Sequence, residues 1–300
     1  STDIVNLTNV GSSDTKIGMN KTSNIASDLS AKYTNTALAG SSDTVTINLT
    51  GGVGSTSSVA ADNTIKVYSA SATNAAENLT VAVSGAAAFV GNLLSHNNTT
   101  SNTSTLEKLT ITGDQNLTLA TALDFTVAAA AEGIVDASAF TGDLSVIVSE
   151  AILTNITGGS GADTISVIGG NFTSTDTVDG GAGIDTVLIG SLADDASVTL
   201  STTYNMSNVE KVSIEGATGT ASDGVDLTIS ATQAGMTDLI LVESQAEATG
   251  TDAEAGGFTV TNLTPDVGVT LRNNKVDSTG GDFSKINTTT LGLVDASGTA

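Results

Sequence analysis

The sequence predicts an all-β solenoid, and three observations lead to this fold class. The 300-residue chain is rich in Thr, Val, Ile, Ser and Asn, which fit a pleated surface, whereas only 14% of its residues are charged and 3% are aromatic. Short runs alternate between apolar and polar residues with period two, as half-buried strands do. Several phrases recur along the chain, and units this small bury an apolar face only by stacking on a neighbour.

The alternating runs place strands along most of the chain. Their apolar positions would face a core, and their Thr, Ser and Asn positions would face solvent. Helix formers such as Lys, Arg, Gln and Glu are scarce, so we expect any helix to be short and to lie at residues 128–132 or 231–234. The strands expected with most regular alternation lie at residues 44–49, 79–83, 109–112, 144–148 and 258–260.

Internal echoes favour stacked coils over a β-sandwich. GSSDT occurs at 11–15 and 40–44, VDAS at 135–138 and 294–297, and LEKLTI at 106–111 has a partner, VEKVSI, at 209–214. Each echo is centred on a strand-like segment. We therefore expect a parallel β-helix or β-roll with three regions: a Thr/Asn-rich solenoid over 1–155, a glycine/aspartate segment over 156–192, and a continuing solenoid over 193–300.

The net charge of the chain limits the classes of partner that it can bind. Acidic residues outnumber basic ones 32 to 9, which gives a net charge of −23. Nucleic acids and anionic membrane surfaces both attract clustered Lys and Arg, so we expect neither as a partner. No stretch is long and apolar enough to span a bilayer, so we expect no membrane insertion. Divalent cations would relieve the self-repulsion, although an acidic extracellular protein that binds no ion remains the alternative.

The chain contains no cysteine, which excludes disulfides and cysteine zinc sites. An extracellular protein without disulfides must draw its stability from size, repetition or metal. The first residues have neither the basic nor the apolar region of a secretory signal. Because the chain also lacks an initiator Met and ends at Ala300, we expect it to be a piece of a longer polypeptide.

Two nonapeptides carry the clearest chemistry. Residues 158–166 (GGSGADTIS) and 180–188 (GGAGIDTVL) both match G-G-x-G-x-D-x-U-x, where U is a large apolar residue. Repeats of this kind form calcium-binding β-rolls. The glycines let the chain turn tightly through positive φ, while backbone carbonyls and the Asp carboxylate supply oxygens. Calcium takes about six to eight oxygen ligands, so the sequence predicts a Ca²⁺ site. The alternative is that these loops are ordinary turns.

Spacing indicates how the turns stack. Gly158 and Gly180 are 22 residues apart, longer than a coil of two nonapeptides, and the segment 169–178 between them resembles a widened turn on the opposite side. We expect one calcium ion shared by the two complete turns and a weaker or absent site opposite. Asp179, directly before Gly180, either adds a ligand or stays solvated, and we favour solvation. The candidate metal ligands are Asp163, Asp185, Asp176, Gly158, Gly159, Gly161, Gly180, Gly181 and Gly183.

These residues and their surroundings resemble the RTX-type surface-layer (S-layer) proteins of Gram-negative bacteria. In that group, short G-G-x-G-x-D clusters are embedded in Thr-, Ala- and Asn-rich β-solenoids, and the phrases at 135–138 and 208–214 are typical of it. The nonapeptides cover only about residues 156–190, and the rest of the resemblance is mainly compositional. Toxin-type RTX proteins carry long uninterrupted tracts, so two copies point to a local clamp.

The resemblance implies a structural function outside the cell. It implies type I secretion through a C-terminal signal beyond this chain, and self-association into a two-dimensional lattice on the bacterial surface. Calcium would stabilise the fold and the lattice contacts. Attachment to lipopolysaccharide would belong to a region outside this chain. An RTX-type secreted adhesin is the alternative, since adhesins share the calcium, the acidity and the lack of cysteine, but the irregular echoes here favour the S-layer.

We expect no enzymatic activity. Polysaccharide lyases and epimerases also use parallel β-helices and calcium, but their catalysis needs basic or tyrosine groups close to acidic ones. Here Arg272, His96 and the three tyrosines are scattered without a local motif. The recognised hydrolase, metalloprotease and phosphate-binding motifs are also absent from the sequence.

Overall fold

A computed structural model describes the chain in segments, and these segments fall into two compact units. The first unit contains Ser1–Ile165 and Val178–Gly183, and the second contains Ser166–Thr177 and Ile184–Ala300. The chain therefore passes between the units within the predicted glycine/aspartate segment. The described residues are 3–20, 27–52, 63–69, 71, 74–96, 104–125, 132–148, 154–168, 171–192, 197–216, 227–243, 258–264, 266–273 and 289–293.

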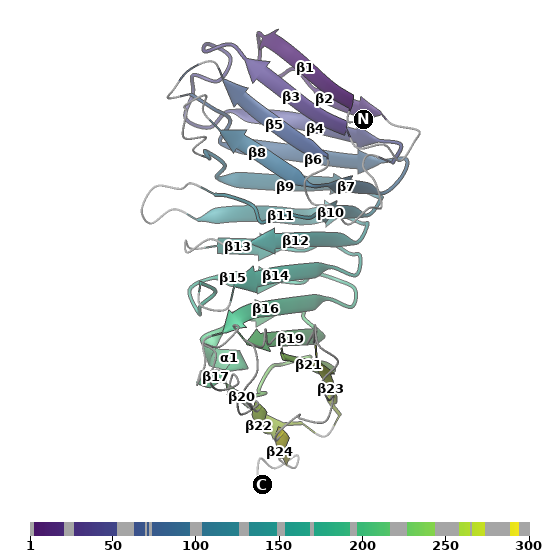
Figure 1. The fold of residues 1–300 in the computed structure, drawn as a ribbon, viewed down its shortest axis with the longest axis vertical. Coiled ribbons are helices and arrows are strands. Elements are labelled where there is room, and N and C mark those ends of the chain that lie inside the picture. The colour runs from purple at the N-terminus through teal and green to yellow at the C-terminus, as the bar shows by residue number, and fades with distance from the viewer. Residues whose placement is uncertain are drawn as a thin grey trace, which may run out of the picture. The chain divides into compact units, whose positions relative to one another are not determined.

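Strands make up nearly all of the regular structure (Figure 1). The first unit contains β1 (Asp3–Val10), β2 (Ile17–Asn20), β3 (Ser27–Tyr33), β4 (Thr44–Thr50), β5 (Thr64–Ser69), β6 (Asn78–Ser84), β7 (Ala88–Val90), β8 (Asn92–His96), β9 (Lys108–Gly113), β10 (Leu117–Leu119), β11 (Gly133–Phe140), β12 (Leu144–Val148) and β13 (Thr154–Thr157). Strands β14 (Thr164–Ile168) and β15 (Thr177–Asp179) each contain residues of both units. The second unit contains β16 (Thr186–Leu192), β17 (Ser197–Thr199), α1 (Leu200–Thr203), β18 (Met206–Ser207), β19 (Lys211–Gly216), β20 (Leu227–Ser230), β21 (Asp238–Glu243), β22 (Phe258–Leu263), β23 (Gly268–Asn273) and β24 (Thr289–Leu293).

The first unit is a parallel solenoid. Its strands contribute to one sheet in the order β2-β4-β6-β9-β11-β13 and to two opposite sheets in the orders β1-β3-β5-β8 and β7-β10-β12. A strand pairs with a strand one coil further along rather than with its sequence neighbour, and these pairs are parallel. Figure 1 shows the result as successive rungs coloured from purple to teal. The predicted all-β parallel fold is thus confirmed.

Columns of aliphatic side chains form the core of this unit. Val45, Ile47 and Leu49 on β4 are at most 1% exposed. They stand in register with Leu79, Val81 and Val83 on β6. Neighbouring strands lie about 4.8 Å apart, so each core residue packs on an equivalent residue of the next coil. Burial of these columns supplies the main favourable free energy of the fold.

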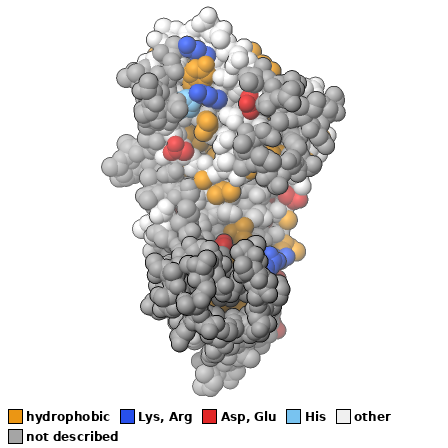
Figure 2. Space-filling model, in the orientation of Figure 1, with side chains coloured by type: hydrophobic (Ala, Val, Ile, Leu, Met, Phe, Trp, Pro, Cys, Tyr) orange, Lys and Arg blue, Asp and Glu red, His pale blue; other side chains and the backbone are white. Residues whose placement is uncertain are grey.

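Polar side chains occupy the outer face of the same strands. Thr46, Thr80 and Thr110 stand in register on β4, β6 and β9, and the next position in this row is Asp136 on β11. Figure 2 shows one face of the molecule, on which few charged side chains lie among uncharged ones. The solvent-facing Thr pattern expected from the sequence is therefore present.

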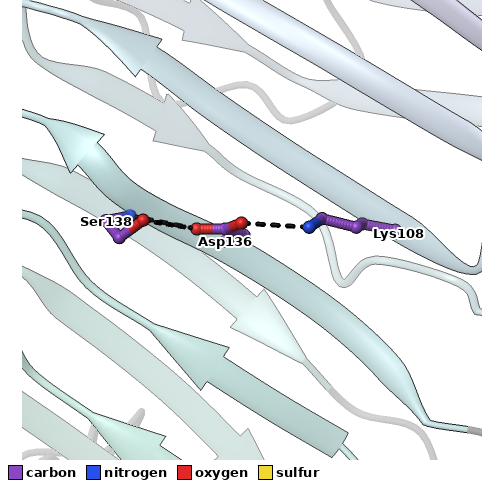
Figure 3. Close-up of polar contacts among 3 residues, drawn as sticks. All are labelled: Lys108, Asp136 and Ser138. Carbon is purple, nitrogen blue, oxygen red and sulfur yellow. Dashed lines mark hydrogen bonds and ion pairs between the residues drawn. The ribbon is translucent and has the colours of Figure 1, made fainter.

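Asp136 forms the ion pair shown in Figure 3. Lys108 Nζ lies 3.0 Å from Asp136 Oδ2, and the Ser138 hydroxyl donates to Asp136 Oδ1 at 2.7 Å. The Ser138 hydroxyl and then the Lys108 ammonium hold the pKa of Asp136 below its ordinary value. The first VDAS echo therefore has a local structural reason, while the second, at 294–297, lies outside the described residues.

The coils of the first unit shorten toward the glycine/aspartate segment. Register partners are 34 residues apart between β4 and β6, 30 between β6 and β9, 26 between β9 and β11, and 21 between β11 and β13. A shorter coil leaves fewer residues for each corner, and tight corners need glycine. The 22-residue spacing of the two nonapeptides fits this short-coil region better than it fits the long coils before it.

The second unit is also built from two parallel sheets. Their orders are β16-β19-β21-β23 and β17-β20-β22-β24, and all these pairs are parallel. Val187, Val212 and Leu239 form one fully buried column. Tyr204 directly follows α1. Its ring stacks on that of Phe172, with centroids 5.2 Å apart and planes 5° from parallel.

The strand predictions agree with the structure better than the helix predictions do. The five expected strands correspond to β4, β6, β9, β12 and β22. The helix expected at 231–234 is wrong, because these residues form an irregular segment whose Ala231 N–H donates to the Thr261 carbonyl oxygen across neighbouring coils. Residues 128–131 lie outside the described chain. Across the described residues, no helix is long and apolar enough to cross a membrane.

Candidate metal centre

The glycine corners of the two nonapeptides, residues 158–161 and 180–183, stack on one another within the first unit. Ala182 N–H donates to the Gly159 carbonyl oxygen at 2.9 Å, and Gly158 N–H donates to the Asp179 carbonyl oxygen at 2.7 Å. These bonds join residues of the two turns across one 22-residue coil. The stacking that the spacing of Gly158 and Gly180 predicts is therefore present.

Glycine is required at these corners because the coils approach backbone to backbone. A Cβ added at Gly161 would meet the Gly142 carbonyl oxygen, and one added at Gly183 would meet the Gly161 carbonyl oxygen, each far inside 3.0 Å. The same holds for Gly181 against the Gly159 carbonyl oxygen. Gly181 and Gly183 also have positive φ, 94° and 133°. Gly142, Gly161 and Gly183 thus form a column, here called the glycine column.

Gly158 and Gly159 extend this close approach. A Cβ at Gly158 would meet the Gly180 carbonyl oxygen and would lie 2.6 Å from Asp163 Oδ2, while one at Gly159 would meet the Phe140 carbonyl oxygen. A side chain is therefore excluded at each of these two glycine positions.

Asp163 is fully buried at this corner. Its Oδ2 accepts the Gly159 N–H at 2.6 Å, and its Oδ1 accepts the Leu144 N–H at 2.8 Å. The carboxylate therefore joins its own turn to strand β12 of the preceding coil. Burial raises the pKa of Asp163, the two amide hydrogen bonds act in the opposite direction, and the negative charge of Asp143 raises the pKa further.

The Asp163 carboxylate and the backbone carbonyl oxygens near it are of the ligand type that calcium prefers, and a calcium site at this corner stays a prediction. A carboxylate oxygen that accepts one amide hydrogen bond has further lone-pair capacity. A bound cation would also offset the desolvation of the buried Asp163 carboxylate. No group of three or more His, Cys, Asp or Glu side chains in the described part of the chain is placed to hold a metal ion.

Asp185 lies in the second unit. It is buried, its N–H donates to Glu210 Oε2 at 2.8 Å, and its carbonyl oxygen accepts the Lys211 N–H at 2.9 Å. Asp185 and Glu210 are register neighbours directly before β16 and β19. A calcium cage shared by Asp163 and Asp185 would involve both units, and it stays a prediction.

The degenerate turn between the two nonapeptides is closed by its own side chains. Asp176 is buried, and its Oδ2 accepts the Thr173 N–H at 2.8 Å and the Thr173 hydroxyl at 3.0 Å. Phe172 anchors the same loop by stacking on Tyr204. Gly169 and Gly170 lie outside the described residues. A metal-ligand role for Asp176 stays a prediction.

Asp179 is partly exposed, and its Oδ1 accepts the Gly181 N–H at 3.1 Å. This short-range bond orients the entry into the second nonapeptide turn. Asp179 therefore has a local structural role in the turn. The expectation that it stays solvated remains a prediction.

Comparisons with protein-family models, curated proteins and solved structures found no match. Inference about function therefore depends on the residues and geometry of the turns.

A wider pattern of acidic corner residues was missed in the sequence. Glu77 Oε2 accepts the Asp43 N–H at 2.7 Å, and Glu210 and Asp163 accept amides of neighbouring coils in the same manner. Each of these acids stands directly before a strand. In the sequence, such a corner acid can be recognised as an Asp or Glu directly before an alternating apolar run.

Three of these acids form a like-charged row. Asp43, Glu77 and Glu107 directly precede β4, β6 and β9 at in-register positions. Burial raises the pKa of Glu77, and the neighbouring charges of Asp43 and Glu107 raise it as well, against backbone hydrogen bonds that lower it. The folded state therefore disfavours the charged form of Glu77.

Replacing Glu77 with Gln is expected to raise the melting temperature at pH 7. A raised carboxyl pKa in the folded state costs stability above that pKa, and the cost disappears below the pKa of the unfolded chain. Gln keeps an acceptor for the Asp43 N–H but carries no charge. Thermal melts from pH 7 to pH 4 should show the gain shrinking as pH falls. Glu132→Gln, at an exposed position, is the matched control. A gain in melting temperature of Glu77→Gln that stays the same at pH 4 would contradict an origin in the charge of Glu77.

Proposed function

We propose that this chain is a structural component of a bacterial S-layer, stabilised by calcium bound at its glycine/aspartate turns. The observation that carries the proposal is the stacking of two complete nonapeptide turns, with glycine backbone against glycine backbone and Asp163 buried between Gly159 and Leu144. A solenoid with such turns is a long-lived scaffold that needs no disulfide. The proposed extracellular location follows from the resemblance of the chain to RTX-type S-layer proteins.

Bound calcium would supply positive charge beside the buried Asp163 carboxylate and the backbone carbonyl oxygens of the two turns. The residues of the chain would form the site around the ion. Asp163 and the carbonyl oxygens of the two turns would hold the ion, and the glycines would keep the corner free of side chains. Asp163 already joins two coils through amide hydrogen bonds, so binding at this carboxylate would oppose separation of the coils.

The outer faces are suited to contacts between copies. On the outer side of β4, β6 and β9, Thr46, Thr80 and Thr110 stand in register. We propose self-association into a two-dimensional lattice through such faces. Attachment to lipopolysaccharide would come from a region outside this chain. No catalytic role is part of the proposal.

Electron microscopy of assembly tests the function directly. The chain, first freed of metal with a chelator, should form ordered sheets when calcium is added and should remain dispersed in magnesium at equal ionic strength. Asp163→Asn should require more calcium for assembly. Monomers that stay dispersed in calcium, as judged by analytical ultracentrifugation, would contradict the lattice proposal. Monomers that bind a cell-surface receptor would instead favour an RTX-type adhesin.

A further inference from the structure

Two lysines of the first unit lie on the outer face of strands β3 and β5. Ala31 and Val67 are fully buried and stand in register, so the neighbouring residues Lys32 and Lys66 point away from the core. Both lysines are partly exposed. Within the described part of the chain, neither of them forms an ion pair. Their positive charges are therefore available to a partner.

Aromatic side chains lie beside these lysines. Tyr68 stands in register with Lys32 on one side and with His96 on the other. Its ring stacks on that of His96, with centroids 6.0 Å apart and planes 18° from parallel. Lys66 Nζ lies 4.9 Å from the centre of the Tyr68 ring, and this cation–π contact orients the ammonium without removing its charge. Lys32, Lys66 and Tyr68 are here called the basic face.

Little negative charge lies on the same side of these strands. Asp28 is on the outer side of β3, four residues before Lys32, and its Oδ1 accepts the Thr64 N–H at 2.8 Å. Figure 2 shows basic and hydrophobic side chains gathered around the histidine in the upper part of the view. In a chain with 32 acidic and 9 basic residues, the basic face is therefore a local exception to the overall charge.

The other sheet of the first unit offers the opposite charge. Asp43, Glu77 and Glu107, here called the acidic row, precede successive strands of that sheet, and all three are partly exposed. Lys108, which follows Glu107, is already paired with Asp136. Burial raises the pKa of Glu77, and the charges of Asp43 and Glu107 raise it further. Positive charge from outside would relieve the repulsion within the row.

The two surfaces share the repeat of the coils. Lys32 and Lys66 come from adjacent coils, as do Asp43 and Glu77, and neighbouring strands lie about 4.8 Å apart. Charges with the same repeat can pair at more than one coil when two copies lie side by side. The basic face and the acidic row belong to different sheets. A contact between them joins unlike surfaces, and such head-to-tail contacts can continue into an open array.

We propose that the basic face of one copy binds the acidic row of a second copy. This inference rests on the proposed self-association and names two of the surfaces that meet. Charge complementarity selects this pairing, because two copies with a net charge of −23 would repel each other through most other surfaces. Complementary charges across an interface mainly determine which surfaces meet and how fast they associate.

Charge reversal in the whole chain tests this pairing. Lys32→Glu combined with Lys66→Glu would place negative charge opposite the acidic row. The protein concentration needed for sheets in calcium should then rise by about tenfold or more, since like charges that face each other across an interface are strongly unfavourable. Lys16→Glu combined with Arg272→Glu is the matched control, because both positions are exposed outside the basic face and the net charge changes equally. Its threshold concentration should stay within about twofold of that of the unmodified chain.

Mixing two variants separates specific pairing from general repulsion. Glu77→Lys combined with Glu107→Lys makes the acidic row basic, so this variant should also assemble poorly alone. In a mixture with the Lys32→Glu, Lys66→Glu variant, every contact again joins opposite charges, and sheets should return near the threshold of the unmodified chain. Circular dichroism melts check that each variant is folded, and Glu107→Lys alone replaces the double variant if the latter is unfolded.

The outcomes for the contact and for the lattice are distinguishable. If the Lys32→Glu, Lys66→Glu variant assembles like its control, the pairing is wrong and the proposed S-layer function still stands. Folded variants that stay dispersed when mixed would also overturn the pairing. If the unmodified chain forms no sheets, the lattice proposal fails, and sedimentation of the mixed variants at low salt still tests the pairing, since they should form dimers or larger species there.

Discussion

Replacing Gly161 with Ala is expected to destabilise the first unit by about 1–3 kcal/mol, near the upper end of that range. The new Cβ would overlap the Gly142 carbonyl group and the Asp143 nitrogen of the preceding coil. These are backbone atoms, so no side-chain rotation relieves the overlap. The coils would have to separate, which would weaken the hydrogen bonds between Asp143, Asp163 and the neighbouring amides.

Gly11→Ala is the matched control for this substitution. No atom lies within 4 Å of a Cβ placed at Gly11, and exposed substitutions of this kind usually change stability by less than about 0.5 kcal/mol. Urea unfolding followed by circular dichroism, in chelator, measures the steric cost without a contribution from calcium. Equal midpoints for Gly161→Ala and Gly11→Ala would contradict the backbone-on-backbone stacking.

Removing calcium is expected to lower the melting temperature of the unmodified chain. An ion that binds only the folded state stabilises it by mass action, by about 2.7 kcal/mol at a free concentration one hundred times Kd. The rise in melting temperature on adding calcium should grow with calcium concentration, until unfolding of a part of the chain that binds no calcium limits it. Differential scanning calorimetry across a calcium series measures it, and magnesium at the same concentration should give a smaller rise because it prefers a stricter octahedral geometry.

Asp163→Ala should remove most of this calcium response and also destabilise the chain in chelator. The Leu144 and Gly159 amides lose their acceptor, and a buried unsatisfied donor costs about 1–3 kcal/mol. Asp163→Asn restores an acceptor without the charge, so it should recover part of the stability in chelator but not the response to calcium. A full calcium response in Asp163→Asn would show that this carboxylate is not a ligand.

The strands could be predicted from the sequence because their signal is local. Val45, Ile47 and Leu49 alternate with Thr and Asn, and burial of one face follows directly from that alternation. The stacking of the two nonapeptide turns was predictable for a similar reason. The motif marks both corners, and the spacing of Gly158 and Gly180 corresponds to one coil.

The contacts of Asp143 with Asn116 and Ala162 could not be predicted, because they depend on register between coils. Register partners in the first unit are 36 residues apart between β3 and β5 and 21 apart between β11 and β13, so the sequence alone does not say which corner residues become neighbours. Residues 141–143 contain one glycine and one aspartate, a pattern too short to be recognised as a turn of the stack. Only the paired strands β10 and β12 bring Asn116 beside Asp143.

The helix prediction failed because local preference was overridden by coil pairing. Ala231 has high helix propensity, but its N–H donates to the Thr261 carbonyl oxygen of the next coil instead. The helix α1, Leu200–Thr203, has no side-chain N-cap. Its segment, LSTT, contains no local helix signal, and it directly precedes the buried Tyr204 that stacks on Phe172.

Anomalous X-ray scattering from crystals grown in calcium would locate the ion itself. The stacked glycine turns should show an anomalous peak within about 2.3–2.6 Å of an Asp163 carboxylate oxygen and of backbone carbonyl oxygens at the same corner. The peak should disappear from crystals of Asp163→Asn. A well-ordered corner with no peak at millimolar calcium would contradict calcium binding by these turns.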